Sequence, residues 1–473
     1  MRRREFIEGA ALLAAASTGN LFRESLQARL TLDLSRTISR IPPNFMGLGY
    51  ETSSVARPGL LSAKNPVYVQ LCRTLGSSGT IRVGGNTSDY ASYAASSQAF
   101  SSPETGPGSI VNEAVLRELG SFLEATGWSL IWGLNLGRGT VEGVVEEANA
   151  VRAATGPHLL AFEIGNEPDL FPHREMHRKK GYDYEDYLRD YRRFRDALFK
   201  NIPGIPLAGP DVANATSWIS RFARDEGHNI KLLTHHYYRE GQNPTSSIEK
   251  LLQPDPKLAP MLAELRAVSK SSGVPYRICE TNSFSGGGKP GVSDRFASAL
   301  WVLDFIYKLA SAECDGVNME TGVNQLGFVS SYSPIGDDER GHYVAAPEFY
   351  GVLAFAYGAV GELVECRFGA ENHNLEAYTT LKRDKRLCVT LINKEPALDT
   401  SVIIERTLPF EKGSVLRLSA PSLDSNAGVS FGGAMVKSDG TWRPVRAEKI
   451  QGADGKIIVR LPAASAAVLI MER

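Results

Sequence analysis

Short apolar runs alternate with amphipathic stretches from residue 44 to residue 320. The apolar runs indicate buried strands, and the 3.6-residue hydrophobic period between them predicts helices. The predicted helices include residues 111–126, 182–200, 255–272 and 293–312. The eight predicted strands are residues 44–51, 79–85, 128–135, 159–166, 205–210, 230–237, 274–280 and 314–320. Near-continuous apolar strands separated by helices are typical of a covered parallel sheet, and eight such units favour a closed (β/α)8 TIM barrel.

The pattern changes after residue 361, where short alternating strands follow one another without intervening helices. This arrangement predicts a C-terminal antiparallel β-sandwich over residues 361–473, after a catalytic barrel over residues 39–360. An alternating segment also precedes the barrel, and we expect a strand over residues 29–38 to pair with the sandwich. The predicted C-terminal strands are residues 363–368, 375–382, 387–393, 401–405, 414–418, 456–461 and 466–471.

The first 28 residues have the features of an export signal. Arg3 and Arg4 precede Phe6 and a short run of alanines and leucines, in the manner of a twin-arginine signal peptide. Cleavage is expected after Ala16 or later, near residue 28. We therefore expect an exported protein, periplasmic or secreted, and the apolar run is too short to span a bilayer.

Composition narrows the possible partners and cofactors. The chain has 473 residues, 22% of them charged, and a net charge of −1 without a long basic block, which argues against a nucleic-acid partner. The turn Gly84-Gly85-Asn86 is not a dinucleotide fingerprint, and no phosphate-binding loop motif is present. His173 and His177 stand four residues apart, a spacing that could bind a metal on a helix, but the sequence His-Arg-Glu-Met-His is not the zinc-binding H-E-x-x-H motif, so no metal or other cofactor is predicted.

Polar residues gather where the predicted barrel strands end. Strand four ends in Asn166 and Glu167 before Pro168, and strand seven ends in Glu280. Burying an unpaired carboxylate is costly, so we expect these groups at the rim, where TIM barrels hold their active sites. The other predicted strand-end groups are Glu51, the 86–89 turn, Asn135, Asp211, the 235–238 segment and Glu320.

Two carboxylates on opposite strands fit the cleavage of a glycosidic bond. In a retaining enzyme one carboxyl protonates the departing oxygen, and the other attacks the anomeric carbon from about 5–5.5 Å away. Glu167 and Glu280 can face each other across the barrel mouth, with Asn166 donating to the sugar 2-hydroxyl. His236 is expected to bind sugar or to support a strand end, and Glu320 is the main rival carboxylate.

The placement of these glutamates resembles the clan A retaining glycoside hydrolases, and the chain most closely resembles glycoside hydrolase family 79, the β-glucuronidases and heparanases. The resemblance covers the barrel and the trailing β-domain. The motifs that carry it are Arg82-Val-Gly-Gly-Asn-Thr-Ser-Asp-Tyr90, Gly165-Asn-Glu-Pro-Asp169, His235-His-Tyr-Tyr238 and Glu280-Thr-Asn-Ser-Phe-Ser-Gly-Gly-Gly288.

The resemblance implies a role for each matching residue. Glu167 corresponds to the acid/base, and Glu280 to the nucleophile. The resemblance also implies substrate contacts by position. Tyr332 is added as a phenol donor to a sugar carboxylate. The other implied contacts are Asp89, Glu51, Tyr238, and the backbone N–H groups of Gly286 and Gly287.

The residue before the glycines departs from the family pattern. Members acting on glucuronate commonly have a tyrosine there, where this chain has Ser285. The expected activity is hydrolysis of terminal β-linked glucuronic or 4-O-methyl-glucuronic acid. The alternatives are a neutral β-pyranoside such as a β-xyloside or β-glucoside, an arabinofuranoside, and a non-catalytic carbohydrate-binding barrel.

Overall fold

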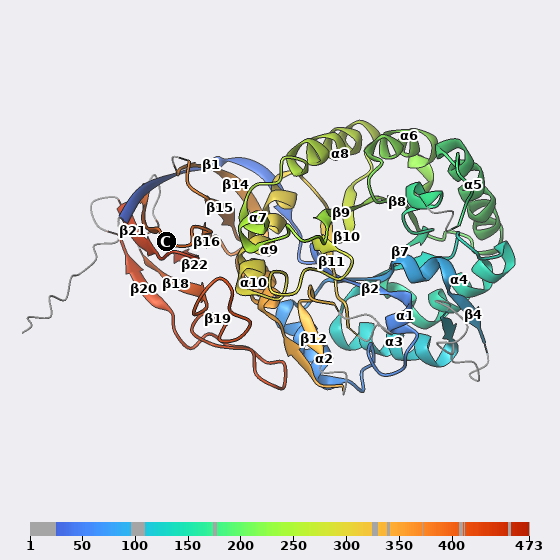
Figure 1. Cartoon of the computed structure of the whole chain (residues 1–473), viewed down its shortest axis with the longest axis horizontal. Helices are drawn as coiled ribbons and strands as arrows, with labels where there is room; N and C mark the ends of the chain where they lie inside the picture. Colours follow the sequence, from blue (N-terminus) through green and yellow to red (C-terminus); the bar gives the residue numbers. More distant parts are fainter. Residues whose placement is uncertain are drawn as a thin grey trace, which may run out of the picture.

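The computed structural model describes residues 25–95, 109–173, 177–323, 330–337, 341–370, 372–405, 410, 412–452 and 456–472. They form a parallel eight-stranded barrel beside a mostly antiparallel sheet, with helices α9 (Phe296–Ser311) and α10 (Pro347–Gly358) between the two (Figure 1). The predicted TIM barrel with a C-terminal β-sandwich is confirmed. The predicted export signal lies almost entirely in residues 1–24, outside the described residues.

The barrel closes in chain order, because each strand pairs in parallel with the next and β11 pairs with β2. All eight predicted strands are present, and β9 and β10 extend further than expected. This extension places Tyr238 and Ser285 on strands instead of in loops. The barrel strands are β2 (Met46–Glu51), β3 (Thr80–Gly84), β6 (Ser129–Leu134), β7 (Leu159–Ile164), β8 (Leu207–Val212), β9 (Leu232–Gly241), β10 (Tyr276–Ser285) and β11 (Gly316–Glu320).

Helices surround the barrel, and local signals set their ends. The side chain of Asn112 accepts a hydrogen bond from the backbone of Val115 at the start of α3, and Gly127 ends that helix in a left-handed conformation. The remaining helices around the barrel are α1 (Thr52–Val55), α2 (Pro66–Leu75), α4 (Val141–Thr155), α5 (Tyr184–Asn201), α6 (Thr216–Glu226), α7 (Ile248–Leu252) and α8 (Leu258–Ser272); α3 spans Glu113–Thr126.

The second domain is one continuous ten-stranded sheet that folds around its own core. Strand β1 (Ser25–Ile41) lies inside it, antiparallel to β14 and parallel to β17. Leu30, Val389, Val402, Val459 and Leu469 belong to the core that the sheet encloses. Its other strands are β14 (Gly361–Gly369), β15 (Leu375–Leu381), β16 (Leu387–Asn393), β17 (Asp399–Glu405), β18 (Lys412–Ser419), β19 (Ser430–Phe431), β20 (Glu448–Gln451), β21 (Lys456–Leu461) and β22 (Ser465–Glu472).

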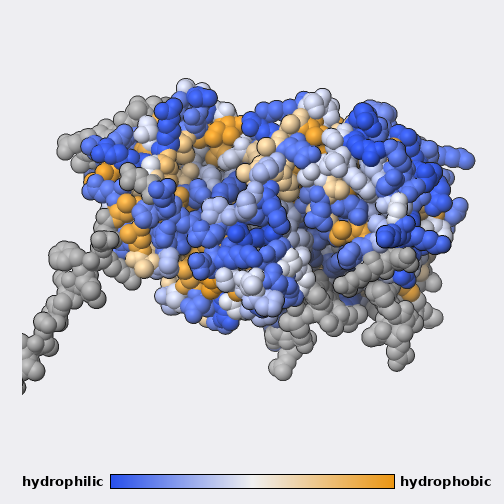
Figure 2. Space-filling model, turned by 45° about the horizontal axis from the view of Figure 1, so that its top comes forward, coloured by the Kyte–Doolittle hydropathy of each residue, from blue (hydrophilic) through white to orange (hydrophobic). Residues whose placement is uncertain are grey.

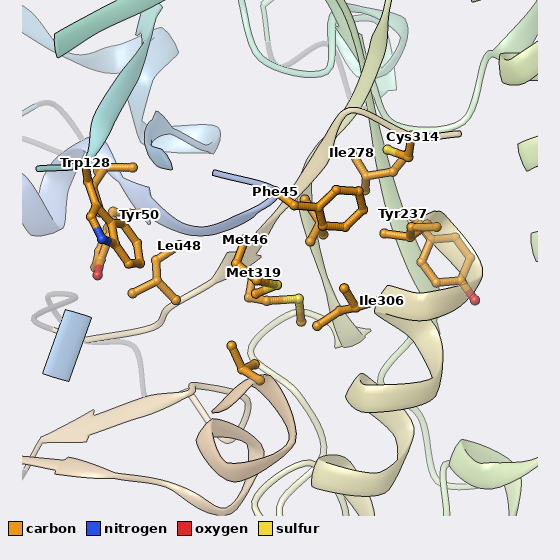
Figure 3. Packing of buried hydrophobic residues seen from close by; sticks show 14 of the residues in the cluster. Phe45, Met46, Leu48, Tyr50, Trp128, Tyr237, Ile278, Ile306, Cys314 and Met319 are labelled. Carbon is orange, nitrogen blue, oxygen red and sulfur yellow. The ribbon is translucent and has the colours of Figure 1, made fainter. Parts of the chain in front are cut away.

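Two further small sheets border the barrel, β4 (Ser92–Ala94) with β5 (Ile110–Asn112), and β12 (Ile335–Asp337) with β13 (Tyr343–Ala345). The barrel strands pack on the helices through a large apolar core, in which Phe45, Met46 and Met319 lie close to Ile306 of α9 (Figure 3). The coloured part of the face shown in Figure 2 is mostly hydrophilic, with small scattered apolar patches. Among the described helices, none has both the length and the apolar composition needed to cross a bilayer.

A buried ionic cluster joins α9 to the second domain. Asp304 of α9 accepts hydrogen bonds from Lys394 (2.6 Å), Lys308 (2.8 Å) and the Tyr378 hydroxyl (2.7 Å). The rings of Tyr307 and Tyr378 stack beside them, 4.4 Å apart. Because Lys394 and Asp304 are both buried, each depends on the other for its charge to be tolerated.

We expect Asp304→Ala to lower the free energy of unfolding by about 3–5 kcal/mol, because it removes the hydrogen-bonded anion of the buried Lys394 ammonium and leaves only Glu376, at 3.8 Å, among the described residues. Chemical denaturation followed by tryptophan fluorescence measures this loss. The matched control is Asp384→Asn, which breaks the exposed pair with Arg386 and should leave the denaturation midpoint unchanged. Equal effects of the two substitutions would contradict the proposed role of the cluster.

Candidate active site

A cavity of about 810 Å³ opens at the C-terminal ends of the barrel strands, a volume typical of small-molecule sites. Five glutamates contribute to its wall: Glu51, Glu167, Glu240, Glu280 and Glu320. The cavity wall includes Glu51, Glu167, His236, Tyr238, Glu280, Ser285, Gly286, Glu320 and Tyr332.

The backbone at the end of β7 turns sharply to present Glu167. Gly165 has φ +87°, and Glu167 itself has φ +49° and ψ +51°, in the left-handed region that non-glycine residues seldom adopt. The peptide N–H of Glu167 donates to the carbonyl of Asp211 at 2.8 Å, and Pro168 prevents the strand from continuing. This strained turn leaves the Glu167 side chain at the cavity wall, 15% exposed.

Glu280 lies on β10, and two donors hold its carboxylate. The Tyr238 hydroxyl donates to Oε1 at 2.9 Å, and Nη1 of Arg82 donates to Oε2 at 2.7 Å. Both donors stabilise the ionised form and fix the direction of the oxygens. The side chain is 11% exposed, and this exposed part faces the cavity.

The imidazole of His236 lies between the two glutamates. Its Nδ1 is 3.1 Å from Oε1 of Glu167 and 3.8 Å from Oε2 of Glu280. One carboxyl oxygen of each glutamate and a ring nitrogen of His236 all lie within 4.8 Å of one another. This separation matches the short spacing of retaining glycosidases and is below the roughly 6.5–9.5 Å that inverting enzymes need to admit a water.

Arg82 of β3 is fully buried below the two glutamates and binds four groups at once. Besides Glu280, its guanidinium donates to Glu163 (3.1 Å), Asn166 (2.8 Å) and Asp211 (2.6 Å). A planar group with five N–H donors can satisfy such a ring of acceptors, whereas a lysine could not. Arg82 therefore links β3 to the ends of β7, β8 and β10.

Asp211 also fixes the charge of His236, because its Oδ1 lies 2.8 Å from Nε2. Burial lowers the pKa of His236, but the nearby Asp211 and Glu280 outweigh this effect and raise the pKa well above its usual value. A doubly protonated ring has no free lone pair, so it is a poor metal ligand. Although the spacing of Glu167, His236 and Glu280 could admit an ion, this chemistry argues against a metal site.

Three carboxyl groups near Glu280 in the cavity wall have raised pKa values. Burial and the neighbouring Glu280 raise the pKa of Glu167, although the hydrogen bond from His236 opposes the rise. Burial and Glu280 also raise the pKa of Glu51, to about 7, and the pKa of Glu320 well above its usual value. The cavity thus places Glu280, which is held by two hydrogen-bond donors, beside three carboxyl groups whose pKa values are raised.

Asp89, an expected sugar contact, is bound by backbone N–H groups. Its oxygens accept hydrogen bonds from the backbone N–H groups of Leu136 (2.9 Å), Gly137 (2.7 Å) and Asn166 (2.9 Å). It is 1% exposed and absent from the cavity wall. In the described structure Asp89 ties the turn after β7 to the turn after β6, and its contact with the sugar stays a prediction.

Two other expected substrate contacts, Asn166 and Gly287, are not among the residues that line the cavity. Asn166 turns its Oδ1 towards Arg82, and the Gly287 carbonyl accepts from the N–H groups of Ser331 and Tyr332. Gly286 lines the cavity with φ +81°, and its carbonyl accepts from Nε2 of Gln242 at 2.6 Å. The glycine loop is therefore held through its carbonyls, an arrangement that suits presentation of its N–H groups.

Sequence reasoning missed Arg82 and Glu163, and it noted Asp211 only as a strand end. The available signal was a charge inside an apolar strand: Arg82 stands between Ile81 and Val83, and Glu163 between Phe162 and Ile164. Buried opposite charges imply partners. Nothing in the sequence indicated which residues would meet.

Comparison with curated proteins gives relatives with the expected activities. The chain is 25% identical to a β-glucuronidase of Aspergillus niger over 90% of this chain and 88% of that protein. It is 29% identical to a β-glucuronidase of Neurospora crassa over 58% of this chain and 55% of that protein, and 28% identical to bovine heparanase over 39% and 35%. No protein-family model matches the chain.

Solved structures share the architecture. A 4-O-α-L-rhamnosyl-β-D-glucuronidase from Fusarium oxysporum superimposes with a TM-score of 0.76 at 17% identity, covering 93% of this chain and 99% of that one. A family 51 arabinofuranosidase from Xanthomonas axonopodis gives a TM-score of 0.66 at 14% identity, covering 95% and 100%. At such identities these likenesses show the fold alone. The curated relatives confirm the resemblance of this chain to the β-glucuronidases and heparanases of glycoside hydrolase family 79.

Proposed function

We propose that this protein is a retaining exo-β-glycosidase that releases terminal β-linked glucuronic acid or 4-O-methyl-glucuronic acid. The observation that carries the proposal is the spacing of Glu167 and Glu280 on either side of His236, within 4.8 Å. The two curated relatives named β-glucuronidase support the substrate class. Two adjacent carboxyl groups with opposite protonation are the minimum that double displacement requires.

In the first step Glu280 attacks the anomeric carbon while Glu167 protonates the departing oxygen. Arg82 and the Tyr238 hydroxyl aim the carboxylate of Glu280. Burial and the charge of Glu280 raise the pKa of Glu167, so it holds the proton that the leaving group needs. The products of this step are a covalent glycosyl-enzyme and the free alcohol.

In the second step water replaces the leaving group and Glu167 acts as a base. The charge of Glu280 is lost in the ester, so one of the causes that raised the pKa of Glu167 is removed, while the effect of burial remains. His236, held protonated by Asp211, then stabilises the Glu167 carboxylate through the 3.1 Å contact. Glu167 removes a proton from water, and the water oxygen displaces Glu280 with overall retention at the anomeric centre.

The sugar is held by groups around this pair. Asn166, whose oxygen is committed to Arg82, keeps its amide N–H groups for the 2-hydroxyl. The N–H groups of the glycine loop and the Tyr332 hydroxyl are proposed to bind the sugar carboxylate, because glycines let backbone donors approach an anion closely. Ser285 lies in the wall where a tyrosine would reach further, which keeps a neutral β-pyranoside as the second candidate.

Azide distinguishes the roles of the two glutamates. With p-nitrophenyl β-glucuronide, whose leaving group needs no acid, Glu167→Ala should lose about 10²–10⁴-fold in turnover, limited by hydrolysis of the glycosyl-enzyme. Added azide should restore turnover and give the β-glycosyl azide, whereas Glu280→Ala with azide should give the α-anomer. Nuclear magnetic resonance identifies both products. Inversion by the unmodified enzyme would exclude the proposed mechanism.

A panel of p-nitrophenyl glycosides tests the substrate: the β-glucuronide, its 4-O-methyl ether, the β-xyloside, the β-glucoside and the α-arabinofuranoside. We expect the highest kcat/KM for one of the two glucuronides, with Ser285→Ala changing KM little. A clear preference for the xyloside or glucoside would favour the neutral substrate, and turnover of the furanoside alone would contradict the pyranosidase assignment. Binding without turnover of any member would indicate a receptor.

Export through a twin-arginine-like signal remains our proposal for localisation, based on residues 1–28. Replacing Arg3 and Arg4 together by lysine should leave the full-length precursor in the cytoplasm of the producing cell, since the charge remains but the arginine pair does not. Immunoblots of cell fractions measure this. Normal export of the double variant would contradict a twin-arginine route.

A further inference from the structure

Glu320, the last residue of β11, lacks partners for both oxygens of its side chain. The side chain is at the cavity wall, yet the residue is only 3% exposed. Neither Oε1 nor Oε2 has a hydrogen-bond partner in the described parts of the chain. Unpaired buried polar groups are costly and uncommon in native proteins, so two such oxygens facing a cavity indicate a missing ligand.

The surroundings of Glu320 disfavour its ionised form. Among its charged neighbours, Glu280 and Glu51 are acidic, while Arg82 and His236 are engaged with other carboxylates. The hydroxyl-bearing rings around it are Tyr50, Tyr238 and Tyr332. An unpaired carboxylate in this place would be destabilised both by desolvation and by repulsion from its acidic neighbours. A neutral carboxyl group is destabilised less by each of these effects.

The neighbouring strand makes room for this side chain. At Gly49 of β2, an added Cβ would lie 2.7 Å from Oε2 of Glu320. Asn282 donates to the Glu320 carbonyl at 3.1 Å and so holds the backbone. The carboxyl group is thus placed by its strand and by a glycine, without any contact that uses its own hydrogen-bonding capacity.

We propose that Glu320 is a substrate-binding residue, held as a neutral carboxylic acid, that donates its proton in a hydrogen bond to an oxygen of the bound sugar. This inference rests on the proposed function and adds a specificity determinant to that site. A neutral acid is both donor and acceptor, so it can pair with a ring hydroxyl or with a uronate oxygen. An ionised Glu320 would repel a uronate, so the proton also makes an acidic sugar tolerable.

The test is the dissociation constant of p-nitrophenyl β-glucuronide, measured by calorimetry at pH 5 in the Glu280→Gln background, where turnover is blocked. Adding Glu320→Ala should weaken binding about tenfold or more, since a lost hydrogen bond in a buried site costs about 1–3 kcal/mol. Adding Glu320→Gln, which keeps one donor and one acceptor, should stay within about threefold. The matched control is Glu147→Gln, because Glu147 is another buried carboxyl group with a raised pKa, about 7, but lies outside the cavity.

The pH dependence adds an independent readout. As pH rises through the raised pKa of Glu320, the donor is lost, so binding should weaken more steeply with Glu320 present than with Glu320→Gln. A residual slope is expected from Glu51, because burial still raises its pKa in the Glu280→Gln background. Because an acid with a raised folded-state pKa loses stability as pH rises, Glu320→Gln should also unfold at the same or a higher temperature at pH 8.

Unchanged affinity in Glu320→Ala, or equal pH slopes in the two forms, would overturn the inference, even if the unfolding temperature moves. A merely structural carboxyl group would change the unfolding temperature alone. Turnover by the unmodified enzyme tests the proposed function, whereas the dissociation constant tests Glu320, so the two proposals can fail separately. Absence of binding in the Glu280→Gln background would also overturn the inference.

Discussion

The buried guanidinium of Arg82 is the interaction on which both the barrel and its site depend. It is fully enclosed and binds Glu163, Asn166, Asp211 and Glu280, which come from the ends of three other strands. Burying such a charge is tolerable only because each neighbour accepts a hydrogen bond from it. The same contacts that satisfy the charge therefore set the position of Glu280, so the stability of the fold and the aim of the nucleophile cannot be separated.

The charges around Arg82 also shift the pKa values of the neighbouring acids in different directions. Asp211 lies between two cations, and Arg82 and His236 overcome the effect of its burial and lower its pKa. Glu163 touches Arg82 as well, but burial and Asp211 raise its pKa to about 7. One acid of the pair therefore carries the charge, and it keeps His236 protonated beside Glu167. Through His236, this charge opposes the rise that burial and Glu280 cause in the pKa of Glu167.

The sequence predicted those features that local periodicity or chain order controls. Eight apolar strands with intervening helices are enough to predict a barrel, and a strand that ends in Asn166-Glu167 is enough to predict a polar rim. The structural contacts of Asp89 could not be predicted, because its partners are backbone N–H groups up to 77 residues away, and no side-chain pattern marks them. From the sequence we expected the first strand to pair with the sandwich, but nothing there indicated which strands β1 would join. Its partners are β14 and β17, more than 300 residues later in the chain.

The two glutamates, Glu167 and Glu280, and the groups proposed to select the sugar are held in place in different ways. Glu280 lies on a barrel strand and Glu167 directly follows one, and both are fixed by buried hydrogen bonds. Gly286 and Tyr332 instead lie in the segments that follow β10 and β11. Hydrogen bonds between these segments and the one after β9 hold them in place: Gln242 donates to the Gly286 carbonyl, and Ser331 donates to the Gly287 carbonyl. Such backbone contacts between loops can be rearranged without disturbing Arg82 or the strands below it. One barrel can therefore keep its reaction while its sugar preference changes, as expected where function resides in sites carried on a common fold.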